Sequence, residues 1–392
     1  MRSSTKLAHR APPAVVRERM KLAHLRLGLG RRTACDVLFL RSGQVTELEP
    51  HLAPHRYIDL EYGSRRVILH PVFLVLLVIN LIKYSTQRAF LKTYVQFYRS
   101  ISVISYDNIP GAWDWADVLE RPMISVQHGM RQMEEGNVGS VPTSNVVFLS
   151  WGNLQIEDYR LGRTPRLPNS SHERTPKQTI PIGSLRDSMY RDLKFPGREK
   201  PGRLCLISQF KGLDGHGLTL PTERQRNIDL LIEHLGRYVE RRHLELVIAL
   251  YSDRPEALEQ EIEWFRGKLG SRCTFNDPSV EFATYKTTDN CEMSFGVHTS
   301  VLWEIFGRGR KMLACNYTGD QVFEFPIDGP WYLKSGTYEE FERRVDDLRA
   351  MSSDDYRSLV GDKAHYLISY SEELPTHRAI GAIISQQVAE RN

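Results

Sequence analysis

The sequence alternates short apolar runs with longer segments of helical periodicity. The runs of the first half are rich in Val, Ile, Leu and Phe, and they read "CDVLFL", "RRVIL", "ISVISYDN", "PMISVQHG", "NVVFLSWG" and "TIPIGS". Between them lie helix-like segments, of which the longest reads "HPVFLVLLVINLIKYSTQRAFLKTYVQFYRS". Strands that alternate with helices build βαβ units, in which the strands lie parallel. The first half therefore predicts a parallel sheet flanked by helices.

A polar break rich in Pro and Gly, "KFPGREKPG", interrupts this pattern, which then starts again. The runs "RLCLISQF", "LELVIALY", "CEMSFGVH" and "RKMLACNY" follow, separated by amphipathic segments such as "TERQRNIDLLIEHLGRYVERR". A chain of 392 residues is also longer than one ordinary core accommodates. The sequence therefore predicts an α/β protein with two doubly wound, Rossmann-like domains that face each other across a cleft.

The domain boundaries follow from the polar break and from the helical pattern of the tail. We expect an N-terminal domain at residues 1–193, a linker at 194–202, a C-terminal domain at 203–372 and a C-terminal helix at 373–392. In doubly wound sheets, ligands bind outside the carboxyl ends of the strands. The loops that follow the strands are therefore the place to look for site residues.

Composition restricts the function only loosely. The net charge is +4, and the tyrosines and arginines form no basic stripe with stacking aromatics, so nucleic-acid binding is not expected. The five cysteines show no CxxC or Cys/His spacing, which argues against a zinc site. The chain also lacks a GxxxxGK[ST] motif and a GxGxxG after its first strand, which counts against a P-loop NTPase and a nicotinamide-dependent enzyme.

The longest apolar run, Val72–Ile82, is too short to span a bilayer, which takes about 20 such residues. Its cationic neighbours Arg65, Arg66 and Lys83 would suit contact with anionic lipid. The alternative is a buried helix of the N-terminal domain, which the apolarity of the run on all sides favours. The sequence thus predicts a cytoplasmic protein and leaves contact with the inner face of the membrane open.

The stretch "CEMSFGVHTSVLWEIFGRGRK" carries the strongest site signal. A strand ends at Gly296, and Thr299 and Ser300 stand where a helix begins. The free N–H groups and the dipole of a first helical turn suit a phosphate. Glu304 lies one turn along on the face of Ser300, where its carboxylate would accept hydrogen bonds from a ribose. The alternative is a capped helix whose glutamate pairs with a nearby arginine.

A second loop, "LISQFKGLDGHG", follows the first strand of the C-terminal domain. Ser208, Gln209 and Lys211 stand there among glycines that let a backbone approach a ligand closely, and Lys211 would offset phosphate charge. His298 and Arg308, on either side of the helix in the previous stretch, are assigned to the same donor site. The alternative for the loop is an ordinary flexible surface segment.

In the N-terminal domain, His128 and Gly129 follow the strand "PMISVQ". A histidine at the carboxyl end of a strand can act as a general base or contact an anionic donor, and Gly129 permits close approach of the backbone. Asp107 ends another strand and would deprotonate a sugar hydroxyl within hydrogen-bond reach. The alternatives are a histidine that satisfies a backbone carbonyl and, for "DNIPG", ordinary turn chemistry.

Together, "ISVQHGM", "VVFLSWGNLQIEDYRLG", "IPIGS" and "CEMSFGVHTSVLWEIFGRGRKMLACN" resemble motifs of GT-B glycosyltransferases of bacterial surface-polysaccharide assembly. The resemblance spans about residues 107–372 and is greatest to the capsule and lipopolysaccharide type, which includes Kdo transferases. It implies that Ser300 and Glu304 bind the nucleotide of a sugar nucleotide, and that His128 and Gly129 face the donor sugar.

The resemblance also implies the partners, a nucleotide-sugar donor and a glycan or lipid-linked glycan acceptor. It implies no cofactor and no metal, because cationic side chains and a helix N-terminus stabilise the leaving group in this family. The chain departs from the family at Trp303, which either reshapes the base pocket or packs inward. Three alternatives stay open: a CDP-glycerol or polyol-phosphate transferase, a UDP-sugar 2-epimerase, and a carbohydrate- or nucleotide-binding protein without turnover.

Overall fold

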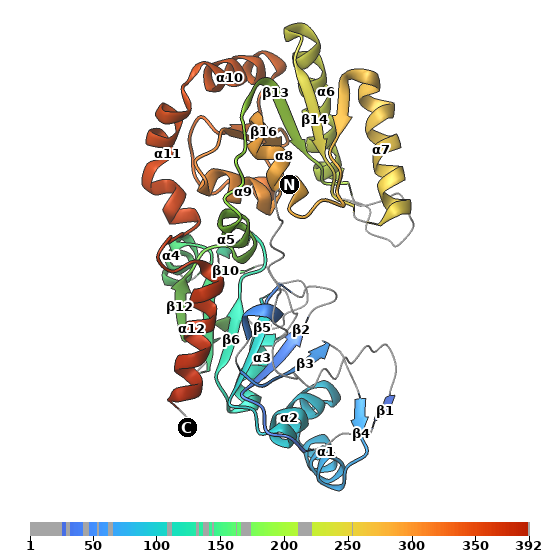
Figure 1. The fold of residues 1–392 in the computed structure, drawn as a ribbon, viewed down its shortest axis with the longest axis vertical. Helices are drawn as coiled ribbons and strands as arrows, with labels where there is room; N and C mark the ends of the chain where they lie inside the picture. Colours follow the sequence, from blue (N-terminus) through green and yellow to red (C-terminus); the bar gives the residue numbers. More distant parts are fainter. Residues whose placement is uncertain are drawn as a thin grey trace, which may run out of the picture.

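The computed structural model divides into two α/β domains, each built on a six-stranded sheet (Figure 1). All strand pairs in both sheets are parallel. The predicted fold class, two doubly wound Rossmann-like domains with a helical C-terminal tail, is confirmed. The structure describes residues 26–28, 32–41, 47–52, 55–61, 66–107, 112–130, 133–135, 141–142, 145–161, 163–165, 174–210, 222–252 and 254–390.

The N-terminal sheet has the strand order β12–β9–β6–β5–β2–β3. Its central strands β5 and β6 are buried along their whole length, because helices cover both faces of a parallel sheet. The bounds are β2 (Val37–Arg41), β3 (Tyr57–Glu61), β5 (Ser102–Tyr106), β6 (Met123–Val126), β9 (Val146–Ser150) and β12 (Gln178–Pro181). Three short pairs lie outside this sheet: β1 (Arg26–Gly28) with β4 (Arg66–Ile68), β7 (Met133–Glu135) with β10 (Arg163–Pro165), and β8 (Val141–Pro142) with β11 (Arg174–Thr175).

Two apolar cores flank the N-terminal sheet, since successive side chains of a strand point to opposite faces. Leu38 and Leu40 of β2 belong to the core under one group of helices, and Val37 and Phe39 belong to the core on the other face. The first core is covered by α1 (Pro71–Lys83), α2 (Thr86–Tyr98) and α3 (Ala112–Leu119). The second lies under η1 (Glu49–Leu52), α5 (Leu185–Asp192) and α12 (Thr376–Ala389), and α4 (Asn153–Arg160) follows β9.

The C-terminal sheet has the strand order β15–β14–β13–β16–β17–β18. The order reverses direction between β13 and β16, and ligands of doubly wound domains bind at the carboxyl ends of the strands at such a point. The strands are β13 (Lys200–Ile207), β14 (Glu245–Ala249), β15 (Cys273–Phe275), β16 (Cys291–Gly296), β17 (Met312–Asn316) and β18 (Tyr332–Lys334). The helices are α6 (Thr222–Arg242), α7 (Pro255–Leu269), η2 (Gly270–Arg272), α8 (Ala283–Asp289), α9 (Ser300–Gly307), η3 (Gln321–Phe323), α10 (Tyr338–Ala350) and α11 (Ser353–Leu367).

The C-terminal helix α12 returns to the N-terminal domain after α11 ends (Figure 1). The backbone N–H of Ser369 donates to the carbonyl of Trp151 over 2.7 Å. Gly183 has φ +90°, and a Cβ there would lie 2.1 Å from the carbonyl oxygen of Ser369, so this close crossing requires a glycine. Ile380 and Ile384 of α12 are fully buried in the core of the N-terminal sheet. The tail therefore joins the two domains a second time.

The long helical pattern around the apolar run divides into α1 and α2, which are separated by Tyr84 in an extended conformation and by Ser85. The expectation that Val72–Ile82 forms a buried helix is wrong. Only Phe73, Leu77 and Asn80 of α1 are buried, because the helix packs on α2 along one side only. Among the described residues, no helix is both long and apolar enough to cross a membrane.

Candidate functional site

The loop after β6 touches the first turn of α9, and this contact joins the two domains at the carboxyl ends of their strands. The backbone N–H of Met130 donates to Ser300 Oγ over 3.0 Å. A Cβ on Gly129 would lie 2.9 Å from the same oxygen, which is closer than carbon and oxygen atoms pack. The structure thus brings together Gly129 and Ser300, which lie far apart in the sequence and were both predicted as site residues.

Two buried side chains hold the loop after β6 in place. Gln127 Oε1 accepts from the backbone N–H of Trp151 (2.7 Å), and Gln127 Nε2 donates to the carbonyl of Gly129 (2.9 Å). Asp107, which is also buried, accepts the backbone N–H of His128 at Oδ1 (2.9 Å). The His128 side chain itself is exposed, and its ring meets the edge of Tyr106 at a centroid distance of 5.2 Å. The loop therefore presents an imidazole on a fixed backbone.

Gln127 is a positioning residue that the sequence analysis did not single out. Its signal was present, because a polar side chain directly after a buried apolar strand needs hydrogen-bond partners. Asp107 was predicted as a base for an acceptor hydroxyl. In the structure it is 4% exposed and it supports the backbone of His128, so its placement is that of a residue acting through its neighbour.

On the opposite side, Thr299 is the N-cap of α9, with extended backbone angles and a side-chain oxygen that accepts from Val301 N (3.4 Å). Gln209 holds the residue before the cap at both backbone groups: Oε1 accepts from His298 N (3.0 Å), and Nε2 donates to the carbonyl of His298. Gln209 follows β13 and His298 follows β16, so the clamp spans the point where the strand order reverses. The first turn of α9 is therefore held rigidly at the position where doubly wound domains bind their ligands.

The two other predicted residues of this segment are Ser208 and Lys211. Ser208 is buried, and its Oγ accepts from the backbone N–H of Phe210 (3.2 Å), which shapes the exit from β13. Lys211 lies outside the described residues.

Glu304 lies on α9 as predicted, but its carboxylate points into the protein. It is 3% exposed, and its two oxygens accept from Ser184 Oγ (2.6 Å) and from the hydroxyl of Tyr285 (2.7 Å). Burial raises the pKa of Glu304 to about 7, and the carboxylate of Asp187 adds to this rise, while the two hydroxyls and Arg308 oppose it. Both oxygens are occupied by hydroxyls, so the predicted contact with a ribose stays a prediction that requires one of these bonds to open.

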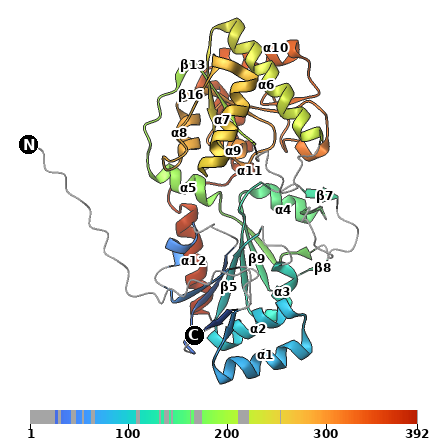
Figure 2. The ribbon, with the colours of Figure 1, turned by 90° about the vertical axis from the view of Figure 1, so that its right-hand side faces the viewer.

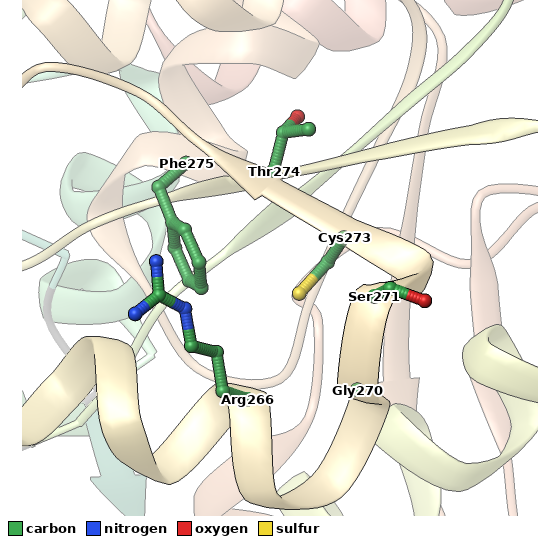
Figure 3. A pocket seen from close by; sticks show the side chains of 6 residues that line it. All are labelled: Arg266, Gly270, Ser271, Cys273, Thr274 and Phe275. Atoms are coloured by element: carbon green, nitrogen blue, oxygen red, sulfur yellow. The ribbon is translucent and has the colours of Figure 1, made fainter.

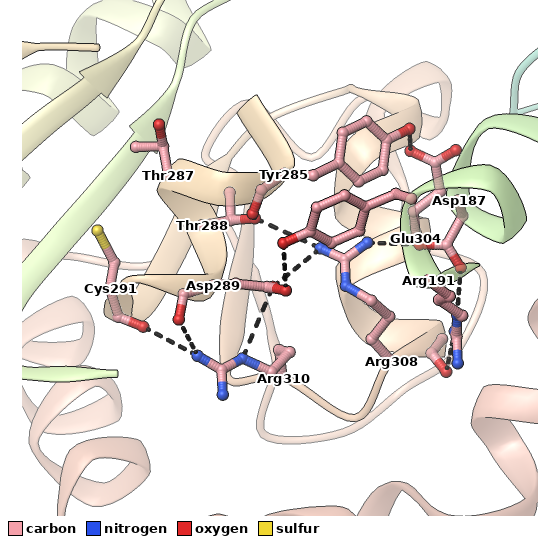
Figure 4. Close-up of polar contacts among 12 residues, drawn as sticks. Asp187, Arg191, Tyr285, Thr287, Thr288, Asp289, Cys291, Glu304, Arg308 and Arg310 are labelled. Atoms are coloured by element: carbon pink, nitrogen blue, oxygen red, sulfur yellow. Dashed lines mark hydrogen bonds and ion pairs between the residues drawn. The ribbon is translucent and has the colours of Figure 1, made fainter. Parts of the chain in front are cut away.

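Arg308 is the C-cap of α9 and lies at the other end of this helix from Ser300, a distance of about 12 Å for eight residues. Its guanidinium is buried in an ion-pair network (Figure 4), in which Asp187 accepts at 2.5 Å and Asp289 at 3.4 Å. Arg310 also pairs with Asp289, and with Glu199. The charge of Arg308 is therefore already balanced, and this arginine takes no part in the donor site proposed below.

Trp303 packs inward, which decides between the two possibilities that the sequence left open. It is 5% exposed, and its ring meets the edge of Trp151 from the N-terminal domain at a centroid distance of 6.4 Å. Trp151 also donates from Nε1 to the carbonyl of Gln127 (3.1 Å). The two tryptophans thus couple α9 to the loop that carries His128.

Two further features of the described residues bear on the site. The residues that the structure describes contain no group of three or more His, Cys, Asp or Glu side chains that could hold a metal ion. A surface hollow (Figure 3) lies at the edge strand β15, three strands from β16 in the sheet order, so it is separate from the loops described above. It is lined by Arg266, Gly270, Ser271, Cys273, Thr274 and Phe275.

No protein-family model matches the sequence, and no curated protein sequence matches it significantly. Solved structures do match the fold. The H444N variant of the wall teichoic acid polymerase TagF has a TM-score of 0.51 and 10% sequence identity, over 93% of this chain and 90% of that one. UDP-GlcNAc 2-epimerase from Neisseria meningitidis bound to UDP-GlcNAc has a TM-score of 0.51 and 10% identity, over 90% of this chain and 99% of that one. The chain therefore adopts the two-domain GT-B fold.

Proposed function

We propose that this chain is a glycosyltransferase that takes a nucleotide-sugar donor and passes its sugar to a hydroxyl of a glycan or lipid-linked glycan acceptor. The donor is a hexosyl or Kdo nucleotide, and the product belongs to bacterial surface polysaccharide of the capsule or lipopolysaccharide type. The proposal rests on the GT-B fold, on the motif resemblance and on the geometry where the two domains meet. It assigns the donor phosphate to the first turn of α9 and the acceptor to the N-terminal domain.

One observation carries the proposal: the hydrogen bond from Met130 N to Ser300 Oγ, which sets the loop with the exposed His128 against the N-terminus of α9. The first N–H groups of a helix have no partner within the helix, and its dipole favours a negative charge there. Thr299 Oγ1 accepts from Val301 N over a long distance of 3.4 Å, so this hydrogen bond is weak. A phosphate oxygen can replace Oγ1 as the acceptor of this N–H group.

The chemistry assigned to these groups is a displacement at the anomeric carbon. The bond from this carbon to the phosphate oxygen breaks, and a bond to the acceptor oxygen forms. The acceptor proton passes to the imidazole of His128, as required of a general base at neutral pH. The electron pair of the broken bond stays on the phosphate, where the N–H groups of α9 stabilise the added charge. Asp107 keeps the backbone of His128 in place.

We propose that the transfer needs no bound metal, because the first turn of α9 takes over the stabilisation of the leaving group. Adding a chelator is then expected to leave turnover unchanged, and adding Mg²⁺ or Mn²⁺ to a chelator-treated sample is expected to have no effect. A transferase whose activity falls with the chelator and returns with one of these ions would contradict this part of the proposal.

The test begins with thermal unfolding in the presence of CMP-, CDP-, UDP- and GDP-linked donors, because a ligand stabilises the folded state according to its occupancy. The donor with the largest shift is then titrated against wild type, Ser300→Ala and His128→Ala. We expect Ser300→Ala to bind the donor several-fold more weakly, and His128→Ala to bind it normally but to lose most of its turnover. Ser279→Ala, a change in the turn at Asp277, is the matched control.

Unchanged donor affinity in Ser300→Ala would sink the assignment of α9 as the donor site. The competing functions give distinct results in the same experiments. Conversion of UDP-GlcNAc without any acceptor would identify a 2-epimerase, and transfer of glycerol phosphate from CDP-glycerol would identify a polyol-phosphate transferase. Donor binding without transfer to any acceptor would identify a binding protein that has lost turnover.

A further inference from the structure

Helix α1 carries an exposed aliphatic face. Val75, Val78 and Ile82 are 59%, 60% and 80% exposed, although aliphatic side chains of this size are usually buried. These positions and three further exposed ones follow each other along one side of the helix, as the spacing of 3.6 residues per turn requires. The further residues are Leu74, Ile79 and Leu81. A contiguous apolar surface of this kind indicates an interaction site.

The opposite side of α1 is fixed on α2, so the exposed face is a consequence of how the helix is seated. Phe73 and Leu77 are buried in the core below. Asn80 is buried as well, and its side-chain amide donates to Thr93 Oγ1 (3.0 Å) and to Gln96 Oε1 (2.9 Å). Turning the aliphatic face inward would break both of these hydrogen bonds and would expose Phe73 and Leu77.

The face lies away from the candidate site. Figures 1 and 2 both place α1 at the end of the N-terminal domain that is farthest from the C-terminal domain. Its 13 residues make a helix of about 20 Å, which is shorter than the apolar thickness of a bilayer, about 30 Å. A helix of this length, with one side on the protein and one aliphatic side exposed, is suited to lie along a membrane surface.

The sequence on both sides of α1 carries charge of one sign. The sequence contains no Asp or Glu from Tyr62 to Tyr106. Strand β1 pairs with β4 so that Arg26 lies opposite Arg66, which brings two cations together at the strand before α1. The cations within the acid-free stretch are Arg65, Arg66, Lys83, Arg88, Lys92 and Arg99, of which Lys92 is buried and pairs with Glu120.

We propose that α1 is a surface anchor that binds an anionic lipid bilayer, with its aliphatic face in the outer acyl region and the neighbouring cations at the headgroups. The face has no side chain that could donate or accept a hydrogen bond, whereas the interfaces between proteins combine apolar contacts with directed polar ones. The cations of this acid-free stretch other than Lys92 match the negative potential of anionic lipid. This inference is independent of the proposed transferase activity.

The test is flotation of the full chain with vesicles of phosphatidylcholine, alone and mixed with phosphatidylglycerol. We expect binding to the mixed vesicles only, weakening as NaCl is raised, because salt screens the attraction. Combining Val78→Ser with Ile82→Ser should weaken the binding by about tenfold for each side chain removed from the acyl region. The matched control combines Val280→Ser with Leu359→Ser, which changes exposed aliphatic residues of the C-terminal domain and should bind as wild type does.

Equal binding of wild type and the Val78/Ile82 variant would overturn the proposal, and so would equal binding to neutral and anionic vesicles. Self-association of the wild type that disappears in the variant, without vesicle binding, would identify a second copy of the chain as the occupant instead. Circular dichroism and thermal unfolding of the variants check that they fold. The salt dependence of vesicle binding by wild type tests the attraction to anionic lipid even where a variant does not fold.

Discussion

Glu304→Gln should remove a pH dependence of stability that originates at a single buried carboxyl. Burial raises the pKa of Glu304 from its ordinary 4.5 to about 7 in the folded protein. In the unfolded chain this burial is lost, so the folded state binds the proton more tightly. The carboxyl therefore contributes stability that is fully present below the unfolded pKa, and this contribution is lost as the pH rises through about 7.

The magnitude follows from the difference between the two pKa values. A tenfold difference in proton affinity is worth about 1.4 kcal/mol, so a rise from 4.5 to about 7 corresponds to on the order of 3 kcal/mol. A Gln amide is neutral at every pH and still offers hydrogen bonds to Ser184 and Tyr285. Between about pH 5 and about pH 8, wild type should therefore lose on the order of 2–3 kcal/mol more unfolding free energy than Glu304→Gln.

The assay is unfolding in urea followed by circular dichroism at several pH values in this range. His51 and His377, whose pKa values are lowered by burial, also change their protonation there, but they do so in both proteins and cancel in the difference. Glu259→Gln, at an exposed position on α7, serves as the control and should follow wild type. Parallel pH curves for wild type and Glu304→Gln would refute the reasoning.

Three further substitutions test the contacts around α9. Gly129→Ala should lower kcat/KM roughly tenfold, because its Cβ displaces Ser300 Oγ, which accepts from Met130 N. Gly267→Ala adds a Cβ with no neighbour within 4 Å and should keep the kcat/KM of wild type; the same kcat/KM for both variants would contradict the contact between Gly129 and Ser300. Trp303→Ala should cost about 3–5 kcal/mol in urea unfolding, and a loss below about 1 kcal/mol would show that the ring is not packed as described. Arg308→Met should cost about 3 kcal/mol because it leaves the buried Asp187 with Arg191 as its one ion-pair partner, whereas the exposed Arg357→Met should cost less than about 1 kcal/mol.

Local patterns were sufficient for the class of both sheets, although the predicted strand "RRVIL" forms β4 of a separate two-stranded pair and the edge strand β3 was not singled out. The longer strands have continuous apolar runs bounded by polar residues, and such runs depend on near neighbours only. The short edge strands β15 and β18 were missed, because three residues carry too little pattern to be distinguished from a loop. The helix α8 was missed for a related reason, since its seven residues "ATYKTTD" show no clear apolar stripe.

The site was predictable to the extent that it depends on strand ends. His128 and Ser300 follow strands of parallel sheets, and such strand ends gather at one edge, so the contact through Met130 agrees with the expectation from topology. The roles of Glu304 and Arg308 were not predictable in this way. Their partners Ser184 and Asp187 are about 120 positions away in the sequence, and no local spacing indicates them.

The sequence by itself determined the α/β class, the two parallel sheets and the strand-end loops, because these follow from short-range periodicity and from the geometry of βαβ units. Tertiary structure alone decided which side of a helix meets the core and which charges are balanced. The aliphatic run of α1 reads as a buried helix, but α2 covers only one side of it. Arg308 was expected to serve the donor site with its charge, but Asp187 on α5 forms an ion pair with it and balances this charge. The burial of α1 depends on how helices pack within the N-terminal domain, and the pairing of Arg308 depends on contact between the two domains, so neither can be derived from local periodicity.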